Sequence, residues 1–196
     1  MATRTEMADQ LRSEAHALLA DSGLFELLQR RFSDPTVTGS ASYDLMVWRS
    51  IDIHLAIDAT ERSDWFAFGA QLAAHLDAVG LGLPRATFGN DYLEPGPMGQ
   101  GLYWGLEFND FSGNRWLVNL WGWDPFDYAV RQARDFTLRT DLAGADRDLI
   151  LRLKTEARQR SNYYGNIVTA FEIYQFAIAK AGDSLSALEK WKATQG

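Results

Sequence analysis

The sequence predicts an α+β fold, with a mixed β-sheet core flanked by helices and followed by a C-terminal helical region. Apolar residues recur at helical spacing near both ends of the chain, over residues 6–30 and from residue 126 onward. Between these ends, apolar and polar residues alternate as they do in strands that are buried on one face. We therefore expect a core with N-terminal helices over residues 1–124, and a C-terminal helical region over residues 125–196 packed on that core.

In the first half of the chain, turn signals separate runs of different periodicity. Residues 6–31 have helical spacing that breaks at Gly23, which predicts one or two helices. Strict alternation over residues 51–57 predicts a strand, and a broad apolar face over residues 63–79 predicts a helix. The remaining elements expected here are a short strand over residues 36–38, one helical turn within residues 42–48 and a strand over residues 84–90.

In the second half of the chain, two strands precede a run of helices. Residues 102–108 and 115–123 alternate strongly, and the polar segment 109–114 predicts a hairpin turn between them. Segment 94–101 is too rich in Pro and Gly for regular structure. After Asp124 the spacing becomes helical, and the expected helices cover residues 126–139, 147–158, 163–181 and 184–193.

The composition excludes several classes of site and partner. With 46% hydrophobic residues in 196, the chain can build a packed core. It has no cysteine, which excludes disulfides, thiolate metal sites and cysteine nucleophiles, and its three histidines show no metal-ligand spacing. The net charge of -7 argues against nonspecific binding to nucleic acid, whereas a small anionic ligand needs only a few local donors.

The sequence also predicts a cytoplasmic protein with no membrane partner. No apolar run approaches the ~18 residues that cross a bilayer. The N-terminal segment is charged throughout and lacks the apolar centre of a signal peptide. The oligomeric state cannot be predicted from these patterns.

One turn and the strand after it carry the residues best suited to chemistry. Gly39 lets the backbone approach a phosphate closely, and Ser40 supplies a hydroxyl and a backbone N–H. An ordinary turn would look the same. On the strand that follows, Ser50, Asp52 and His54 share one face, opposite the apolar residues. We interpret this polar face as the candidate site.

This layout, together with the tryptophan-rich strands over residues 102–123, resembles the nucleotidyltransferase superfamily, which has the DNA polymerase beta-like fold. Segment 171–178 also resembles helical tails of small bacterial members. In that family the Gly-Ser turn holds a triphosphate, and two acidic residues one apart on the strand hold magnesium. A third carboxylate on a neighbouring strand completes the metal site. By position and alternation, Asn119 stands at that third place.

The set of carboxylates is incomplete compared with the family pattern. Either Ser50 and Asp52 or Asp52 and His54 correspond to the acidic pair; we prefer the first alignment because an apolar residue follows Asp52. Under both alignments, Asp52 is the only acid among the three positions. One carboxylate cannot neutralise two magnesium ions, although a single magnesium arriving with the nucleotide could bind through Asp52 and water.

The resemblance therefore implies a protein that binds a nucleoside triphosphate and magnesium at Gly39, Ser40 and Asp52. If active, it would transfer a nucleoside monophosphate to a small hydroxylated acceptor. The alternatives are an inactive nucleotide-binding or regulatory member, or a fold reused for acid-base chemistry by His54 and Asp52. Further candidates are Arg49 and Ser50 at a phosphate, Glu94, Glu107 and Asp110 as substitute acids, the open cases Arg115 and Lys154, and the tryptophans as stacking partners for a base.

Overall fold

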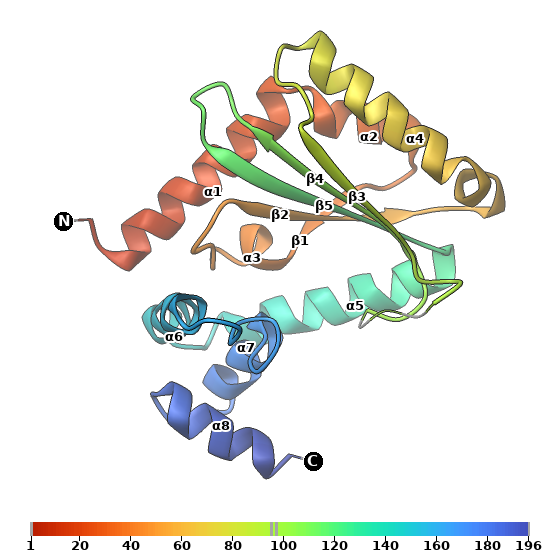
Figure 1. Ribbon diagram of the computed structural model, residues 1–196. Coiled ribbons are helices and arrows are strands. Elements are labelled where there is room, and N and C mark those ends of the chain that lie inside the picture. The colour runs from red at the N-terminus through yellow and green to blue at the C-terminus, as the bar shows by residue number, and fades with distance from the viewer. Residues whose placement is uncertain (1, 95, 97, 196) are drawn as a thin grey trace.

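A five-stranded mixed sheet lies between two groups of helices in the computed structural model, which describes residues 2–94, 96 and 98–195 (Figure 1). Pro95 and Pro97, in the segment expected to be irregular, lie outside the described residues. The strands are β1 (Thr36–Thr38), β2 (Ser50–Ala56), β3 (Arg85–Asn90), β4 (Leu102–Asn109) and β5 (Arg115–Trp123). The helices are α1 (Arg4–Asp21), α2 (Leu24–Arg31), α3 (Gly39–Ser42), α4 (Ala59–Ala78), α5 (Pro125–Leu142), α6 (Arg147–Gln159), α7 (Ala170–Ile178) and α8 (Leu185–Ala193).

The sheet has the strand order β1-β2-β5-β4-β3, and it is mixed because β2 and β5 run parallel while all other neighbours are antiparallel. The α+β prediction is thereby confirmed. The register of the parallel pair sets Asp52 directly beside Asn119, and β1 sets Thr38 on the other side of Asp52. Residues that are far apart in the sequence therefore meet at the centre of one face of the sheet.

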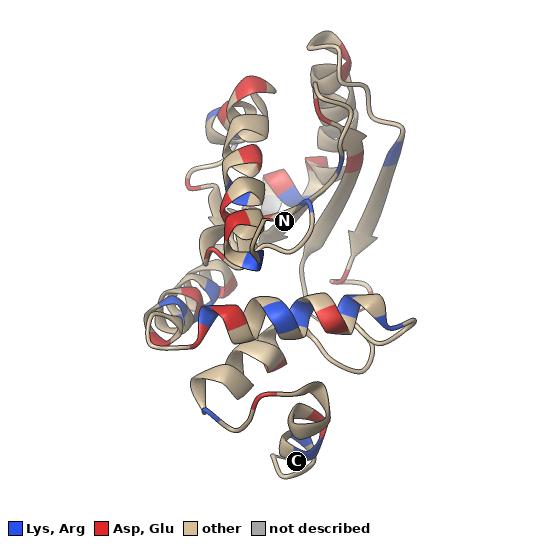
Figure 2. Ribbon diagram, turned by 90° about the vertical axis from the view of Figure 1, so that its left-hand side faces the viewer, with Lys and Arg blue, Asp and Glu red and all other residues tan. Residues whose placement is uncertain are grey.

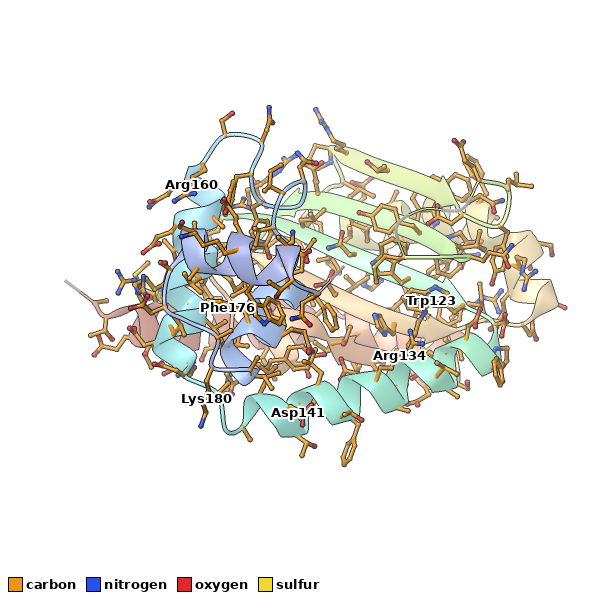
Figure 3. All side chains as sticks on the ribbon, turned by 90° about the horizontal axis from the view of Figure 1, so that it is seen from below. Trp123, Arg134, Asp141, Arg160, Phe176 and Lys180 are labelled. Atoms are coloured by element: carbon orange, nitrogen blue, oxygen red, sulfur yellow. The ribbon has the colours of Figure 1, made fainter. Side chains whose placement is uncertain are left out.

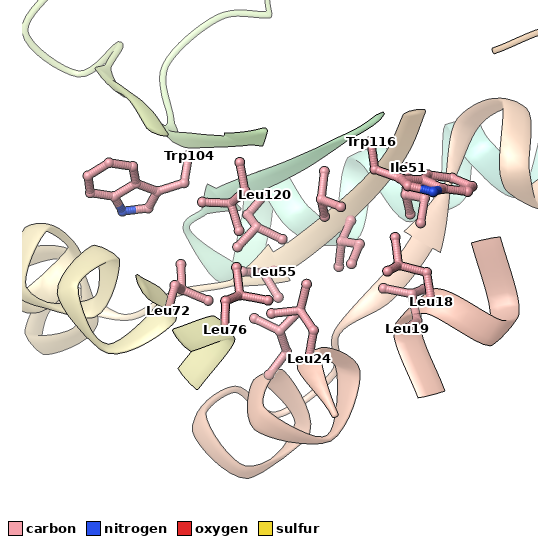
Figure 4. Close-up of a cluster of buried hydrophobic side chains, with 14 of the residues drawn as sticks. Leu18, Leu19, Leu24, Ile51, Leu55, Leu72, Leu76, Trp104, Trp116 and Leu120 are labelled. Atoms are coloured by element: carbon pink, nitrogen blue, oxygen red, sulfur yellow. The ribbon is translucent and has the colours of Figure 1, made fainter. Parts of the chain in front are cut away.

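Buried side chains form two clusters, one on each side of the sheet. In the first, α1, α2 and α4 pack against alternate residues of the central strands (Figure 4). Ile51, Ile53 and Leu55 of β2 are fully buried there, so the polar residues between them face the opposite side. The second cluster joins α6, α7 and α8 below the sheet in the view of Figure 1.

Two local predictions were wrong. The helix expected over residues 163–181 begins only at Ala170, because Thr169 and Glu172 form a capping box, and the chain before it turns through Gly165 at a φ of 88°. The helical turn expected within residues 42–48 lies earlier, as α3, which starts directly after β1. Tyr164 therefore lies in a turn and not on a helix.

Charged residues lie mostly on the helices, and α6 crosses one side of the molecule with a series of Lys and Arg residues among acidic ones (Figure 2). No helix in the described part of the chain combines the length and the apolar character that a bilayer crossing requires. The domain boundary near residue 124 stays a prediction: α5 follows it at once and packs against β2 and β5.

Candidate functional site

A cavity of about 450 Å³ opens on the polar face of the sheet, between β2 and β5 on one side and α5 and α7 on the other. Its floor carries Ser50, Asp52 and Asn119, and Gly39 and Ser40 stand at its side. The Gly-Ser turn and Asp52 thus line one and the same cavity. The remaining wall includes aromatic side chains from Trp48, Trp121, Tyr164, Phe171 and Tyr174.

The Gly39 turn lies against the carboxylate of Asp52. Gly39 has a φ of 64°, which glycine adopts without strain. A Cβ atom at this position would stand 2.9 Å from Oδ2 of Asp52. Only glycine fits here, because both the backbone conformation and the space beside the carboxylate exclude a side chain.

Asp52 belongs to a hydrogen-bonded chain that crosses three strands. The amide nitrogen of Asn119 donates to Oδ1 of Asp52 at 2.8 Å and to the Ser50 hydroxyl at 3.3 Å. The Tyr103 hydroxyl in turn donates to the Asn119 amide oxygen at 2.7 Å. Burial raises the pKa of Asp52, and the Asn119 bond opposes that shift. Asn119 thus presents its N–H donors, and not its amide oxygen, to Asp52, the carboxylate on the cavity floor.

Lys154 of α6 holds the Gly-Ser turn from behind. Its side chain is fully buried, and its Nζ donates to the Ser40 hydroxyl at 2.7 Å, to the Tyr174 hydroxyl at 3.0 Å and to the Leu45 carbonyl. Burial lowers the pKa of Lys154 to about 7, and the nearby charge of Asp52 opposes this shift. The amine of Lys154, whose charge depends on its surroundings, therefore lies directly behind the Ser40 hydroxyl that lines the cavity.

Two arginines of α5 add positive charge at the cavity wall. Figure 3 shows Arg134 on α5 near the end of β5 that carries Trp123. Arg134 lines the cavity, is exposed, and forms no ion pair with the described residues. Arg131 stacks over the Trp123 ring, 4.0 Å from its centroid. Asp135, between them and the turn, accepts from the hydroxyls of Thr38 and Tyr43 and so is already engaged.

His54 lies on the cavity wall next to an aromatic ring rather than next to a proton acceptor. Its ring meets Trp123 edge-on at a centroid distance of 4.5 Å, and its Nδ1 is buried without a partner among the described residues. Burial lowers the pKa of His54 to about 4, so the imidazole is neutral at pH 7. A base of this strength contributes little general-base catalysis near neutrality.

Several residues singled out in the sequence lie elsewhere. Arg49 pairs with Glu14 of α1 at 2.8 Å and does not line the cavity. Glu107 pairs with Arg115 at 2.9 Å, and Glu94 is exposed in the loop after β3. Asp110 caps the hairpin turn, where it accepts from Ser112, Asn114 and Trp116. Trp116 packs in the core, with 1% of its surface exposed, and does not line the cavity.

Sequence reasoning missed Arg134 and left Lys154 undecided. Arg134 has no local signal, because it lies on a helix whose place beside the turn is set by tertiary packing. A lysine within the apolar run of α6, at a position where burial is expected, was the available sign for Lys154.

The donor set does not fit a site for two magnesium ions. Magnesium prefers several oxygen ligands with negative charge, and two ions need several carboxylates. Ser50 and Asn119 are neutral, and Asn119 presents its nitrogen to Asp52. In residues 2–94, 96 and 98–195, no three His, Cys, Asp or Glu side chains gather in a way that could hold a metal ion.

No protein-family model and no curated protein matches this sequence. Solved structures do match. A structure of Cid1, whose RNA terminal uridylyl transferase activity is described, superposes with a TM-score of 0.52 at 14% identity, covering 87% of this chain and 50% of Cid1. A second, of a mutant Cid1 poly(U) polymerase bound to MgATP, gives a TM-score of 0.50 at 15% identity, covering 87% and 53%.

The chain has the fold of the nucleotidyltransferase superfamily. It spans about half the length of the Cid1 structures it matches. At these identities the likeness concerns the fold alone, and it confirms the fold expected from the Gly-Ser turn and the alternating strands. The roles of Gly39, Ser40, Asp52 and Asn119 stay predictions that rest on the geometry of the cavity.

Proposed function

We propose that this nucleotidyltransferase-fold chain binds a nucleoside triphosphate in the cavity and does not transfer a nucleoside monophosphate from it by two-metal chemistry. The observation that carries the proposal is the floor of the cavity. There the fold keeps the Gly39-Ser40 turn beside Asp52, but an amide donor is bonded to that carboxylate where further acids would be needed. The site retains donors for an anion and lacks the charge for two cations.

In this proposal, the triphosphate lies at the Ser40 side of the cavity. Ser40 lines the cavity and its hydroxyl is already polarised by Lys154 behind it. Arg134 stands on the α5 wall as an exposed guanidinium without an ion pair in the described chain. Lys154 and Arg134 are positive groups on two walls of a site with few carboxylates. They favour binding of an anion there, even though the whole chain is acidic.

In the same proposal, the base of the nucleotide lies against the aromatic side chains of the cavity wall. Trp48 and Tyr164 meet edge to face at a centroid distance of 4.8 Å, and Trp121 stacks on Trp123 at 5.7 Å. Flat rings of this kind favour stacking with a heterocycle. A cavity of about 450 Å³ lies within the range that small ligands occupy.

Transfer of a nucleoside monophosphate to a small hydroxylated acceptor is the second candidate, and a single magnesium held by Asp52 would belong to it. The acid-base alternative with His54 is disfavoured because the lowered pKa of His54 leaves it a weak base. The expectation that no nucleic acid binds stays a prediction.

Calorimetric titration with ATP, GTP, CTP and UTP, each with magnesium and with a chelator, tests the proposal. At least one nucleotide is expected to bind in both conditions, with no pyrophosphate released over hours. Arg134→Ala should weaken binding about tenfold by removing one charge-assisted contact to phosphate. Arg4→Ala, which removes an exposed arginine on α1 that is not part of the cavity lining, is the matched control and should leave affinity unchanged.

Two results would decide against the proposal. Absence of binding by all four nucleotides would remove the nucleotide site altogether. Magnesium-dependent release of pyrophosphate that disappears in Asp52→Asn would establish the second candidate, an active transferase, in place of the first.

A further inference from the structure

The free edge of the sheet is the starting observation. β3 is the last strand in the order and pairs on one side only, with β4 (Figure 1). Its first four residues are exposed, and it carries no proline or inward-pointing charge of the kind that protects sheet edges. The opposite edge strand, β1, has only three residues. In the described chain, β3 is therefore the edge most open to pairing with another strand.

The direction of the backbone groups on β3 can be read from the ladder. The N–H of Asp91 donates to the carbonyl of Gly101, the residue before β4, at 2.8 Å. In an antiparallel pair the bonded residues alternate, so Gly89, Thr87 and Arg85 also point their backbone groups toward β4. Ala86 and Phe88 point both backbone groups outward, and Asn90 points its N–H outward, while the Asn90 carbonyl accepts from Leu93 at 3.1 Å in the turn after the strand.

Aromatic side chains stand exposed next to this edge. Phe66 of α4 is 68% exposed and Phe88 of β3 is 38% exposed. Phe88 meets Phe66 edge-on at a centroid distance of 5.3 Å and lies 5.2 Å from Trp104. These rings belong to the face that α4 covers, whereas the cavity opens on the other face. An apolar patch that continues a free strand edge is typical of an interface.

We propose that β3 pairs with β3 of a second copy of this chain, forming a continuous antiparallel sheet about a twofold axis. The charge pattern selects the occupant and the register. If Phe88 lies opposite Phe88 of the second copy, the two Phe88 residues exchange both backbone hydrogen bonds, and the N–H of Asn90 meets the carbonyl of Ala86, as an antiparallel ladder requires. The same register sets Arg85 opposite Asp91 of the second copy, twice by symmetry.

The two charges in this register are available for the pairing. The Arg85 side chain is 69% exposed and reaches Glu107 only at 4.0 Å, and Glu107 has a closer partner in Arg115. Asp91, in the turn directly after β3, has its carboxylate beside Gly96 and forms no ion pair with the described residues. A cross-strand pair of opposite charge stabilises antiparallel strands, whereas like charges at the same place destabilise them. The edge is therefore complementary to itself.

Sedimentation equilibrium tests the pairing. The wild-type chain is expected to sediment at twice its mass of 22.1 kDa. Arg85→Glu and Asp91→Arg should each weaken the dimer about tenfold or more, and the double variant should recover most of the loss because the opposite charges meet again. Lys190→Glu, an exposed charge reversal on α8, is the matched control and should change nothing.

Amide hydrogen exchange by NMR provides a second readout, independent of whether a variant folds well. The amides of Phe88 and Asn90 should become protected as protein concentration rises, while those of Thr87 and Gly89 should be protected at all concentrations. A monomer at ~100 μM, far above the dissociation constant of a standard interface, would overturn the proposal. So would a dimer that all these variants leave intact. Neither outcome bears on the nucleotide site, because no residue of β3 lines the cavity.

Discussion

Asn119→Asp is expected to destabilise the protein by about 3 kcal/mol at pH 7 without metal, the cost of leaving a buried charge uncompensated. The variant replaces the N–H···O bond of 2.8 Å between Asn119 and Asp52 with two facing carboxylates. Such a pair holds one proton with a raised pKa. Because that carboxyl has a folded pKa above its unfolded one, the folded state binds more protons, and the penalty grows as pH rises from 5 to 8.

Magnesium should reverse part of this loss, because a second carboxylate gives the ion the charged oxygen that the wild type lacks. The measurement is urea unfolding at pH 5 and pH 7, with and without magnesium chloride. Asn119→Leu, which removes the same hydrogen bond without adding charge, should be destabilised at both pH values and insensitive to magnesium. If Asn119→Asp were as stable as the wild type and ignored magnesium, Asp52 would not face Asn119 as described.

Lys154 is expected to make the protein more stable as pH rises from 7 to 9, by about 2 kcal/mol. Burial lowers the pKa of Lys154 to about 7 in the folded state, whereas the unfolded lysine keeps its ordinary value near 10.5. Over this range the unfolded state binds the extra proton, so raising the pH favours folding. Below pH 7 both states carry the proton, and the folded state bears the full cost of the buried charge; this cost shrinks as the pH rises through 7.

Lys154→Met isolates this effect, because methionine fills a similar volume and does not titrate. Its own stability at pH 7 reflects both the lost hydrogen bonds to Ser40 and Tyr174 and the removed burial cost. Because the other titratable groups are the same in both proteins, the difference between their stability changes from pH 7 to 9 reports the titration of Lys154 alone, and the variant should lack the extra gain of about 2 kcal/mol. An equal pH dependence in both proteins, measured by urea unfolding, would show that Lys154 is not buried in the manner described.

The sheet and its polar face could be predicted because strands with one buried face carry a strict alternation. Ile51, Ile53 and Leu55 identify the buried side of β2, and the same period places Asn119 on the cavity side of β5. Gly39 and Ser40 predicted the turn for a different local reason: a backbone with positive φ beside a carboxylate favours glycine.

Contacts between distant helices could not be predicted in this way. Lys154 reaches Ser40 across 114 positions of sequence, and only the packing of α6 against the turn brings them together. Arg49 was expected at a phosphate, but a carboxylate on α1, Glu14, lies within reach and engages it. The start of α7 was missed because the capping pair Thr169 and Glu172 competed with an apolar pattern that continues upstream.

The central claim is that a polyphosphate binds at Ser40, in front of Lys154. Calorimetry at pH 8 with a nucleoside triphosphate, in buffers of different ionisation enthalpy, tests it most directly. At this pH Lys154 is mostly neutral, and an anion at Ser40 would raise its pKa, so binding should take up a substantial fraction of a proton. Lys154→Met should bind without uptake. Nucleotide binding with the same proton balance in both proteins would contradict the account.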